Sequence, residues 1–441
     1  MRALAVTVWV FINLLFFGMC GYMYLLWSQY WLNSDKDLES STNNYDQQIY
    51  LYNRGFLVND SSKYDDTSTS EIKNRIKHSS SSIDNITVVR NSKPRFPNVQ
   101  KSEFIFDSKN FVCKSNDSKI ACNEKTQSFK DKLINEMKRV FLDEGNVLKP
   151  GGKDNSYNVN YQGPRENYME KSQNHMLCEL RNVKIDTIQR RDVPSKLNSF
   201  KGYFPNKGIF EDVQFKSCAV ISSAGSFTLS GSGRRIDSYE VVLRFNNAPT
   251  KGFEIDVGQK TTIRIVNSQV MSKQEFDFLR AAVFRNVTIL GWDPSNYTST
   301  VEEWFQNPEY NLFPNYIGYK RMFPESEIYI MNPQSIWKVW DFLQSNSPNR
   351  LRRNPPSSGF LGITLLLSHC DFVDAYEYIP SVRITKRCHY YEPENNQACT
   401  FGVWHPLAAE KLLTYYMNEA DDRTVFQDGY VRIPGFNKLN C

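Results

Sequence analysis

The stretch "CAVISSAGSF", residues 218–227, carries a short apolar run directly into small polar residues. Similar short runs, rich in β-branched and aromatic side chains, follow it along the chain, with apolar residues at helical spacing between some of them. The sequence predicts strands at 218–222, 240–245, 261–266, 287–292 and 327–331, and helices at 271–284 and 333–344. Strands that alternate with helices predict an α/β fold with a mostly parallel sheet flanked by helices.

Three of the predicted strands end in small or amide side chains, at Ser223, Asn246 and Asn267. In open parallel sheets, ligands bind at the carboxyl ends of the strands. Small residues let backbone amides approach an anion, and an Asn side chain offers both a donor and an acceptor to a sugar or a base. For each loop taken alone, an ordinary turn is the favoured interpretation. Together they predict a nucleotide pocket.

A fourth candidate for anion binding is "NPPSSGFLGITLLLSHC", residues 354–370. The prolines disfavour helix before them, Ser357 or Ser358 can serve as N-cap, and the apolar run from residue 360 to 367 predicts a buried helix. Free amides at its start would attract phosphate or carboxylate, although an ordinary capped helix explains the same residues. The Gly-rich "LSGSGRRI" lacks the third glycine of a dinucleotide-binding loop and the Lys-Ser/Thr of a P-loop.

The first residues predict a membrane anchor. Residues 3–27 form an almost uninterrupted apolar run without charge, and about 20 apolar residues suffice to cross a bilayer as a helix. A cleavable signal peptide has a shorter apolar core and a small-x-small cleavage site. Arg2 before the run, with aromatic residues after it, favours a cytoplasmic N-terminus. We therefore expect a type II signal anchor over residues 1–31; a core helix is the alternative.

Composition divides the rest of the chain. Residues 32–124 are largely rich in Ser, Asn, Asp and Lys, which predicts a flexible, glycosylated stem. Residues 125–441 are long enough for a lumenal catalytic domain. Glycosylation sequons occur at Asn59, Asn85, Asn116, Asn286 and Asn296. The net charge of +5 forms no dense basic block, which argues against nucleic acid as a partner.

The stretch from residue 386 to 411 contains Cys388, His389, Cys399 and His405. These side chains suit zinc, but the spacing of the two cysteines is unusual for a structural zinc site. A disulfide loop and the frame of a catalytic base are the alternatives. In an oxidising lumen, cysteines are normally paired, and eight of the nine cysteines follow the predicted anchor. Their connectivity does not follow from the sequence.

Four segments resemble the sialyl motifs of the animal sialyltransferase family, in the expected order. Residues 218–262 resemble the large motif through "SSAGS", "VLRFNNAPT" and "DVGQKTTIR", and residues 354–376 resemble the small motif. "HYYE" at 389–392 is similar to the third motif, and residues 405–410 to the very short His-x4-Glu motif. "WFQNPEYN" at 304–311 and "WHPLAAEK" further resemble the β-galactoside α-2,6-sialyltransferase branch.

The resemblance implies a glycosyltransferase A-like variant of the Rossmann-type sheet in a single-pass type II protein of the Golgi membrane. It implies inverting transfer from CMP-sialic acid to the 6-hydroxyl of a terminal Gal or GalNAc on N-glycans or related glycoconjugates, without metal or cofactor. The only Asp-x-Asp lies in the predicted stem, at residues 35–37. Because CMP carries a single phosphate, helix amides and hydroxyls can neutralise it.

The resemblance also assigns roles to individual residues. His405 is the expected general base, because an imidazole with a pKa of about 6.5 can take a proton from the acceptor hydroxyl. His389 is expected to meet the donor phosphate. The implied donor contacts are Ser223, Asn246, Asn267, Ser357, Ser358, Gly359 and Thr400, and the implied acceptor contacts are Tyr157, Gln269, Glu309, Trp404 and Lys411.

Disulfides implied by the resemblance are Cys178–Cys441 and Cys218–Cys370, while Cys388–Cys399 would present both histidines to one pocket. By elimination, Cys113 and Cys122 remain as a fourth pair, which the family does not establish.

Glu309 and Trp404 stand where the relatives have Asp and Tyr, so Gal and GalNAc both remain as candidate acceptors. A transferase of another linkage, or a silent lumenal glycan-binding protein on the same fold, is the alternative function.

Overall fold

The short β-rich runs pair into one seven-stranded sheet with the order β5-β4-β3-β2-β1-β6-β7. The strands are β1 (Cys218–Ile221), β2 (Val241–Phe245), β3 (Ile263–Asn267), β4 (Thr288–Trp292), β5 (Ile328–Ile330), β6 (Phe372–Tyr376) and β7 (Tyr430–Pro434). The computed structural model describes residues 110–144, 155–395, 398–402 and 404–441. Neighbouring strands pair in parallel, except that β7 runs antiparallel to β6. The predicted α/β fold with a mostly parallel sheet is confirmed, as are its five predicted strands.

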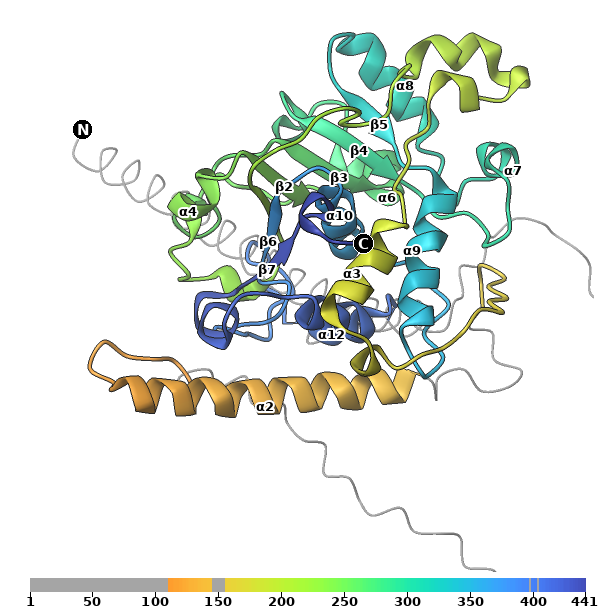
Figure 1. The fold of residues 1–441 in the computed structure, drawn as a ribbon. Helices are drawn as coiled ribbons and strands as arrows, with labels where there is room; N and C mark the ends of the chain where they lie inside the picture. The colour runs from red at the N-terminus through yellow and green to blue at the C-terminus, as the bar shows by residue number, and fades with distance from the viewer. Residues whose placement is uncertain (1–109, 145–154, 396–397, 403) are drawn as a thin grey trace, which may run out of the picture. The chain divides into compact units, whose positions relative to one another are not determined.

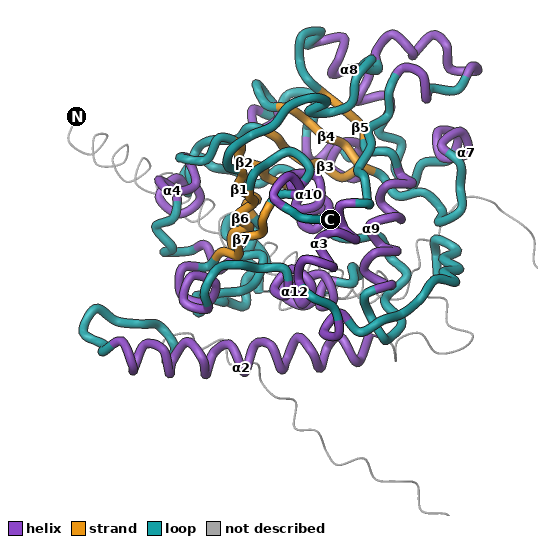
Figure 2. Tube along the Cα trace, in the orientation of Figure 1, coloured by secondary structure: helices purple, strands orange, loops and turns teal. Residues whose placement is uncertain are grey.

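Helices and loops surround the strands (Figure 2). The helices are α2 (Lys119–Glu144), α3 (Gln173–Arg181), α4 (Gly233–Asp237), α5 (Glu254–Val257), α6 (Ser268–Ser272), α7 (Val301–Gln306), α8 (Phe313–Met322), α9 (Pro333–Ser345), α10 (Ser358–Leu367), α11 (Ala398–Phe401) and α12 (Leu407–Tyr416). Short 3₁₀ helices occur at Tyr168–Glu170, Arg190–Asp192, Ser195–Tyr203, Gly225–Phe227, Gln274–Phe276, Ala282–Phe284 and Phe436–Lys438, and a π-helix at Thr424–Asp428.

The central strands are covered on both faces. All residues of β1 and β2 are buried, including their alternate side chains, as expected for a parallel sheet between two layers. Helix α10 packs against β1, β2, β3 and β6. A Cβ atom added at Gly362 of this helix would lie 3.2 Å from Leu243 of β2. The absence of a side chain there lets α10 lie close to the sheet.

Two of the helix predictions are confirmed. Asn332 caps α9 through a bond from the Gln334 amide, and Pro333 takes the first helical position. The Ser357 side chain caps α10 by accepting a hydrogen bond from the Phe360 amide. Both starts follow the usual chemistry of helix N-termini.

The predicted helix at 271–284 is wrong. Helix α6 ends at Ser272, and Lys273 then adopts an extended conformation. Asp277 lies in the left-handed region with φ 42°, and its side chain accepts a hydrogen bond from Arg280 at 3.1 Å. A residue in the left-handed region interrupts a right-handed helix. Buried Phe278 therefore reaches the core from a turn, and buried Phe284 from a 3₁₀ helix.

Ordered structure begins before the expected end of the stem at residue 124. Phe111 is buried, a disulfide joins Cys113 to Cys122, and α2 starts at Lys119. In Figure 1, α2 runs along the domain next to α12, against which it packs. The polar composition of residues 110–124 hides this order, because the disulfide and contacts with distant residues supply it.

Two further disulfides match the expected pairs: Cys178–Cys441 and Cys218–Cys370. Cys388 is also disulfide-bonded, while the side chain of Cys399 lies outside the described part of the chain.

The predicted anchor, most of the predicted stem, and the sequons at Asn59 and Asn85 lie outside the described residues. Among the helices that are described, none has the length and apolarity needed to span a membrane. The sequons at Asn116, Asn286 and Asn296 are exposed.

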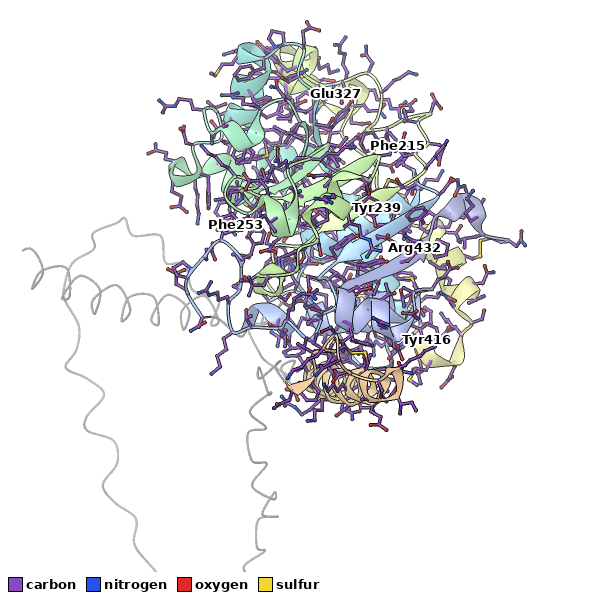
Figure 3. The ribbon with its side chains drawn as sticks, turned by 90° about the vertical axis from the view of Figure 1, so that its left-hand side faces the viewer. Phe215, Tyr239, Phe253, Glu327, Tyr416 and Arg432 are labelled. Carbon is purple, nitrogen blue, oxygen red and sulfur yellow. A yellow bond between two sulfur atoms is a disulfide. The ribbon has the colours of Figure 1, made fainter. Side chains whose placement is uncertain are left out.

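A polar cluster around a buried carboxylate lies where β6 meets β7. Arg432 donates two hydrogen bonds of 2.7 Å to the fully buried Asp374. The hydroxyl of Tyr239 donates to the same carboxylate and lies 3.0 Å from the hydroxyl of Tyr376. Figure 3 labels Tyr239 and Arg432 on this side of the sheet. Burial, and then the charge of Asp374, raise the pKa of Tyr239, so its hydroxyl stays protonated.

We predict that Tyr239→Phe lowers the free energy of unfolding by about 1–3 kcal/mol, because a buried carboxylate loses one of its donors. The matched control is Tyr203→Phe, whose hydroxyl accepts a bond from Arg321 at an exposed site. That change should cost about 0.5 kcal/mol or less. Denaturant unfolding of the full chain, followed by tryptophan fluorescence, measures both. Equal losses for the two variants would contradict the prediction.

Candidate active site

The predicted donor residues of three strands lie at one edge of the sheet. Ser223 follows β1, Asn246 follows β2, and Asn267 is the last residue of β3. The three strands are neighbours and run parallel, so their carboxyl ends meet. The Asn267 side chain caps α6, and its backbone amide donates to the Asn246 side chain at 3.1 Å. The loops after β2 and β3 are therefore in direct contact.

A buried arginine fixes the loop after β2. Arg264 is 2 % exposed, and its guanidinium donates to the carbonyl oxygens of Phe245, Asn246 and Ala248 at 3.3, 2.8 and 3.1 Å. Burial, followed by the nearby charge of Arg244, lowers the pKa of Arg264 to about 10. It stays charged at neutral pH. These contacts hold Asn246 in a left-handed conformation with φ 45°.

The start of α10 points its small residues toward the same edge. The Ser358 hydroxyl accepts a 2.9 Å hydrogen bond from the indole nitrogen of Trp292, which ends β4. A Cβ atom at Gly359 would lie 2.6 Å from the ring of Tyr378. The helix start is thus wedged between the ends of β4 and β6, and only glycine fits at residue 359.

Glu410 joins α12 to the start of α10. The carboxylate is fully buried, and it accepts hydrogen bonds from the amide and the hydroxyl of Ser357 at 2.7 and 2.5 Å. The Tyr378 hydroxyl donates to the same group at 2.7 Å. A buried carboxylate needs such donors. These bonds tie residues 354–359 to the helix that follows His405.

His405 is oriented by the same two segments. Its Nδ1 lies 2.7 Å from the carbonyl oxygen of Pro355, and the Asn354 side chain donates to the carbonyl of Trp404 at 2.8 Å. A carbonyl oxygen can only accept, so Nδ1 carries the proton and Nε2 keeps its lone pair. Burial lowers the pKa of His405, against the opposing effects of Glu410 and of the bond to Pro355. The neutral ring suits a proton acceptor.

His389 reaches the loop after β1 through the backbone. It pairs with Ala224 in an antiparallel bridge, and the next amide, that of Tyr390, donates to the carbonyl of Ser223 at 3.0 Å. Its Nδ1 lies 2.6 Å from the Glu392 carboxylate, so Nδ1 donates and Nε2 is the remaining ring nitrogen. The disulfide at Cys388 removes one thiolate from the zinc alternative.

Three of the predicted acceptor residues lie together. The Tyr157 hydroxyl donates to the Glu309 carboxylate at 2.8 Å, and the Tyr157 ring lies 6.3 Å from that of Trp404. Trp404 in turn lies 4.5 Å from the His405 ring, edge to face. Partial removal from water raises the pKa of Glu309, and nearby Asp293 adds to the shift, although the bond from Tyr157 opposes it. The cluster places an aromatic face and a carboxylate beside His405.

The remaining predicted contacts differ in placement. Gln269 is half-buried at the start of α6. Lys411 is 6 % exposed, and its Nζ donates to the carbonyl of Thr400 at 2.5 Å. Burial lowers the pKa of Lys411 to about 8. Its described contact is thus with α11, which carries the predicted donor residue Thr400, rather than with the acceptor cluster.

Sequence reasoning missed several residues that shape the site. Asp293 is fully buried and accepts hydrogen bonds from the Glu309 amide and from the Trp304 indole. An acidic residue directly after a buried strand was the available signal. Glu410 was identified only as the last residue of the His-x4-Glu motif, and its contacts with Ser357 and Tyr378 were not predicted. Nothing in the sequence pointed to Tyr378.

Comparisons with known proteins identify the family of the chain. A family model described as glycosyltransferase family 29 (sialyltransferase) matches residues 160–421. A beta-galactoside alpha-2,6-sialyltransferase 2 of Danio rerio is 43% identical over 298 residues, which are 67% of this chain and 58% of that protein. Beta-galactoside alpha-2,6-sialyltransferase 1 of Homo sapiens is 41% identical over 289 residues, 65% of this chain and 71% of the relative.

Beta-galactoside alpha-2,6-sialyltransferase 2 of Homo sapiens is 38% identical over 329 residues, 70% of this chain and 62% of that protein. The chain thus spans about three fifths of the length of these Danio rerio and Homo sapiens relatives. A solved structure, "Crystal Structure of a Mammalian Sialyltransferase", shares 21% identity with a TM-score of 0.33, covering 64% of this chain and 81% of that one. Since the family match extends over more than half of its residues, the chain belongs to glycosyltransferase family 29, the sialyltransferase family.

Proposed function

We propose that this protein transfers sialic acid from CMP-sialic acid to the 6-hydroxyl of a terminal Gal, or GalNAc, on N-glycans or related glycoconjugates. Family membership and the names of the relatives support the donor and the linkage. The observation that carries the mechanism is the bond between His405 Nδ1 and the Pro355 carbonyl. It leaves Nε2 as the basic atom of a neutral ring.

In the proposed reaction, His405 Nε2 accepts the proton of the acceptor hydroxyl. The acceptor oxygen forms its bond to the anomeric carbon of sialic acid as the bond from that carbon to the CMP phosphate oxygen breaks. CMP leaves with the electron pair, and attack from the opposite face inverts the anomeric configuration. The role of His405 is therefore general-base catalysis.

The leaving phosphate needs positive charge or hydrogen-bond donors. The positive end of the α10 dipole favours an anion, and Ser358 and Gly359 lie at this helix start. The amide and hydroxyl of Ser357 already donate to Glu410. His389, which is bridged to the loop after β1, is the further proposed contact of the donor phosphate. These groups support a reaction that needs no metal or cofactor.

On the acceptor side, Trp404 is half-buried and offers ring surface next to His405. A sugar ring can pack its apolar face on such an indole while its hydroxyls meet polar groups. Glu309 and Tyr157 provide these groups beside the indole. We place the acceptor Gal or GalNAc here.

We also propose that the catalytic part faces the Golgi lumen behind a type II anchor. Seven of the described cysteines are disulfide-bonded, which fits an oxidising compartment. The exposed sequons at Asn116, Asn286 and Asn296 are available for glycosylation there.

His405→Ala should keep CMP binding but lower turnover by about 10²- to 10⁴-fold, the usual contribution of a general base. The matched control is His369→Ala. The Nδ1 of His369 also meets a backbone carbonyl, that of Val213 at 3.3 Å, but His369 precedes β6 and so lies at the amino ends of the parallel strands, away from the site. Transfer assays and CMP titration measure the two effects. Turnover near the wild-type value in His405→Ala would remove the base assignment.

The pH dependence should follow the lowered pKa of His405. Burial disfavours the charged ring, so Nε2 remains available until the pH falls below the usual histidine value of about 6.5. We expect kcat/KM for the acceptor to stay level through pH 6.5 and to decline only at lower pH. A decline that begins clearly above pH 6.5 would contradict the neutral-base mechanism.

Incubation with CMP-sialic acid and a panel of Gal- and GalNAc-ended glycans, with EDTA present, tests the function as a whole. We expect 6-linked products and no loss of rate from the chelator. Loss of activity with EDTA would return a metal to the mechanism. A product of another linkage would favour a sialyltransferase of that linkage. Glycan binding without transfer would favour a catalytically silent glycan-binding protein.

A further inference from the structure

Residues 110–144 precede the family match, which begins at residue 160, yet they dock on elements that carry the site. Gln427, in the π-helix, links this N-terminal segment to the rest of the domain. Its side-chain nitrogen donates to the Phe111 carbonyl and to the Thr126 hydroxyl, both at 3.0 Å. Its side-chain oxygen accepts from the Cys113 amide at 3.0 Å. Both the donor and the acceptor end of this buried carboxamide therefore bind the N-terminal segment.

Apolar and charged contacts extend this docking. Phe129, Leu133, Met137 and Phe141 of α2 are buried, and Phe129 packs edge to face on Phe426 of the π-helix, with 6.1 Å between ring centroids. Lys130 forms a 2.7 Å ion pair with Asp422. The N-terminal segment is thus a structural partner of the π-helix.

The other side of the π-helix is held by Arg383. Its guanidinium donates to the carbonyls of Gln427 and Asp428 at 2.6 and 2.9 Å. It also donates to the buried Glu377 carboxylate at 2.6 Å and to the Ser226 carbonyl at 3.3 Å. The planar fork of arginine suits such bridging, which lysine cannot reproduce. Arg383 therefore connects the π-helix to the loop that follows β1.

That loop is the one that contains Ser223. The Ser222 hydroxyl donates to the Glu377 carbonyl at 3.2 Å, and a Cβ atom at Gly225 would lie 2.7 Å from the Arg387 carbonyl. Residues 377–387 consequently lie directly against residues 222–226. A shift of Arg383 would therefore displace the backbone on which residues 222–226 pack.

We propose that residues 110–144 act as a brace for the donor-binding loop and that Arg383 is the positioning residue through which the brace acts. The path runs from Phe111 and Cys113 through Gln427 and Arg383 to Ser226. This proposal rests on the proposed function, because it takes the loop with Ser223 as part of the CMP-sialic acid site.

The test uses the full chain in detergent with the variants Gln427→Leu and Arg383→Lys. Gln427→Leu removes the three side-chain bonds to the N-terminal segment, and Arg383→Lys keeps the charge but not the bridge. We expect KM for CMP-sialic acid to rise about three- to tenfold in each, the effect of losing one or two hydrogen bonds. KM for the acceptor should stay within about twofold, since the acceptor cluster lies on other segments.

Arg432→Lys is the matched control. Like Arg383→Lys, this variant breaks an arginine–carboxylate pair, here with the fully buried Asp374. The guanidinium contacts of Arg432 described above include no residue of the loop after β1. It should lower thermal stability and leave the donor KM unchanged. In the double variant of Gln427 and Arg383, the two effects should not add, because they act on one path. Equal changes in both KM values, additive effects, or the same donor effect in Arg432→Lys would overturn the proposal.

Hydrogen exchange separates this proposal from the proposed function. If the wild-type chain transfers no sialic acid, the proposed function fails, but the brace is still testable without substrate. Faster amide exchange over residues 223–228 in both variants, with unchanged exchange in β4, would support the brace. Unchanged exchange over residues 223–228 would overturn it.

Discussion

The site depends on one buried carboxylate. Glu410 is removed from water, and a buried carboxylate is costly unless donors surround it. Its donors come from Ser357, at the start of α10, and from Tyr378, just after β6. The chain can bury Glu410 at low cost only by bringing α12, α10 and the end of β6 together. His405 lies just before α12, the helix that carries Glu410, so the contact that satisfies the carboxylate also sets the ring against the Pro355 carbonyl. The tautomer of the proposed base is thus a consequence of how a buried charge is accommodated.

The loops at the carboxyl edge are held by the same kind of compensation. Arg244 and Arg264 lie opposite each other on β2 and β3, both are almost fully buried, and burial is the first cause that lowers the pKa of each to about 10. Arg264 donates to backbone carbonyls of the loop after β2, whereas Arg244 donates to the carbonyls of Val257 and Lys260, which precede β3. A carbonyl oxygen stabilises the charge of a guanidinium less than a carboxylate would. The bonds from Arg264, however, fix the backbone that carries Asn246. Rigid loops at this edge keep donors in place before a ligand arrives, which is the requirement for electrostatic preorganisation.

The sequence predicted what depends on local pattern. Five strands, the cap at Ser357 and helix α9 follow from short-range rules, and the structure has all of them. It could not predict β6 and β7, because the charge at Asp374 breaks the apolar pattern and is satisfied only by Arg432, far along the chain. The order of residues 110–124 was hidden for the same reason, since Gln427 holds Cys113 across most of the domain. At the site, the residue types were predictable, but the bond from His405 to Pro355 and the position of Lys411 were not.

The two positions where the resemblance predicts a different residue, both on the proposed acceptor side, meet at one residue. Glu309 is one methylene longer than the Asp expected there, and Trp404 is larger than the expected Tyr. The hydroxyl of Tyr157 bonds Glu309, and its ring faces that of Trp404. The backbone of Glu309 is fixed from behind by Asp293, so the added length extends toward Tyr157 rather than moving the main chain. A change at either position is therefore transmitted to the other through one aromatic side chain. Because residues that share a partner do not act independently, we propose that Tyr157, Glu309 and Trp404 act as a unit in the choice between Gal and GalNAc.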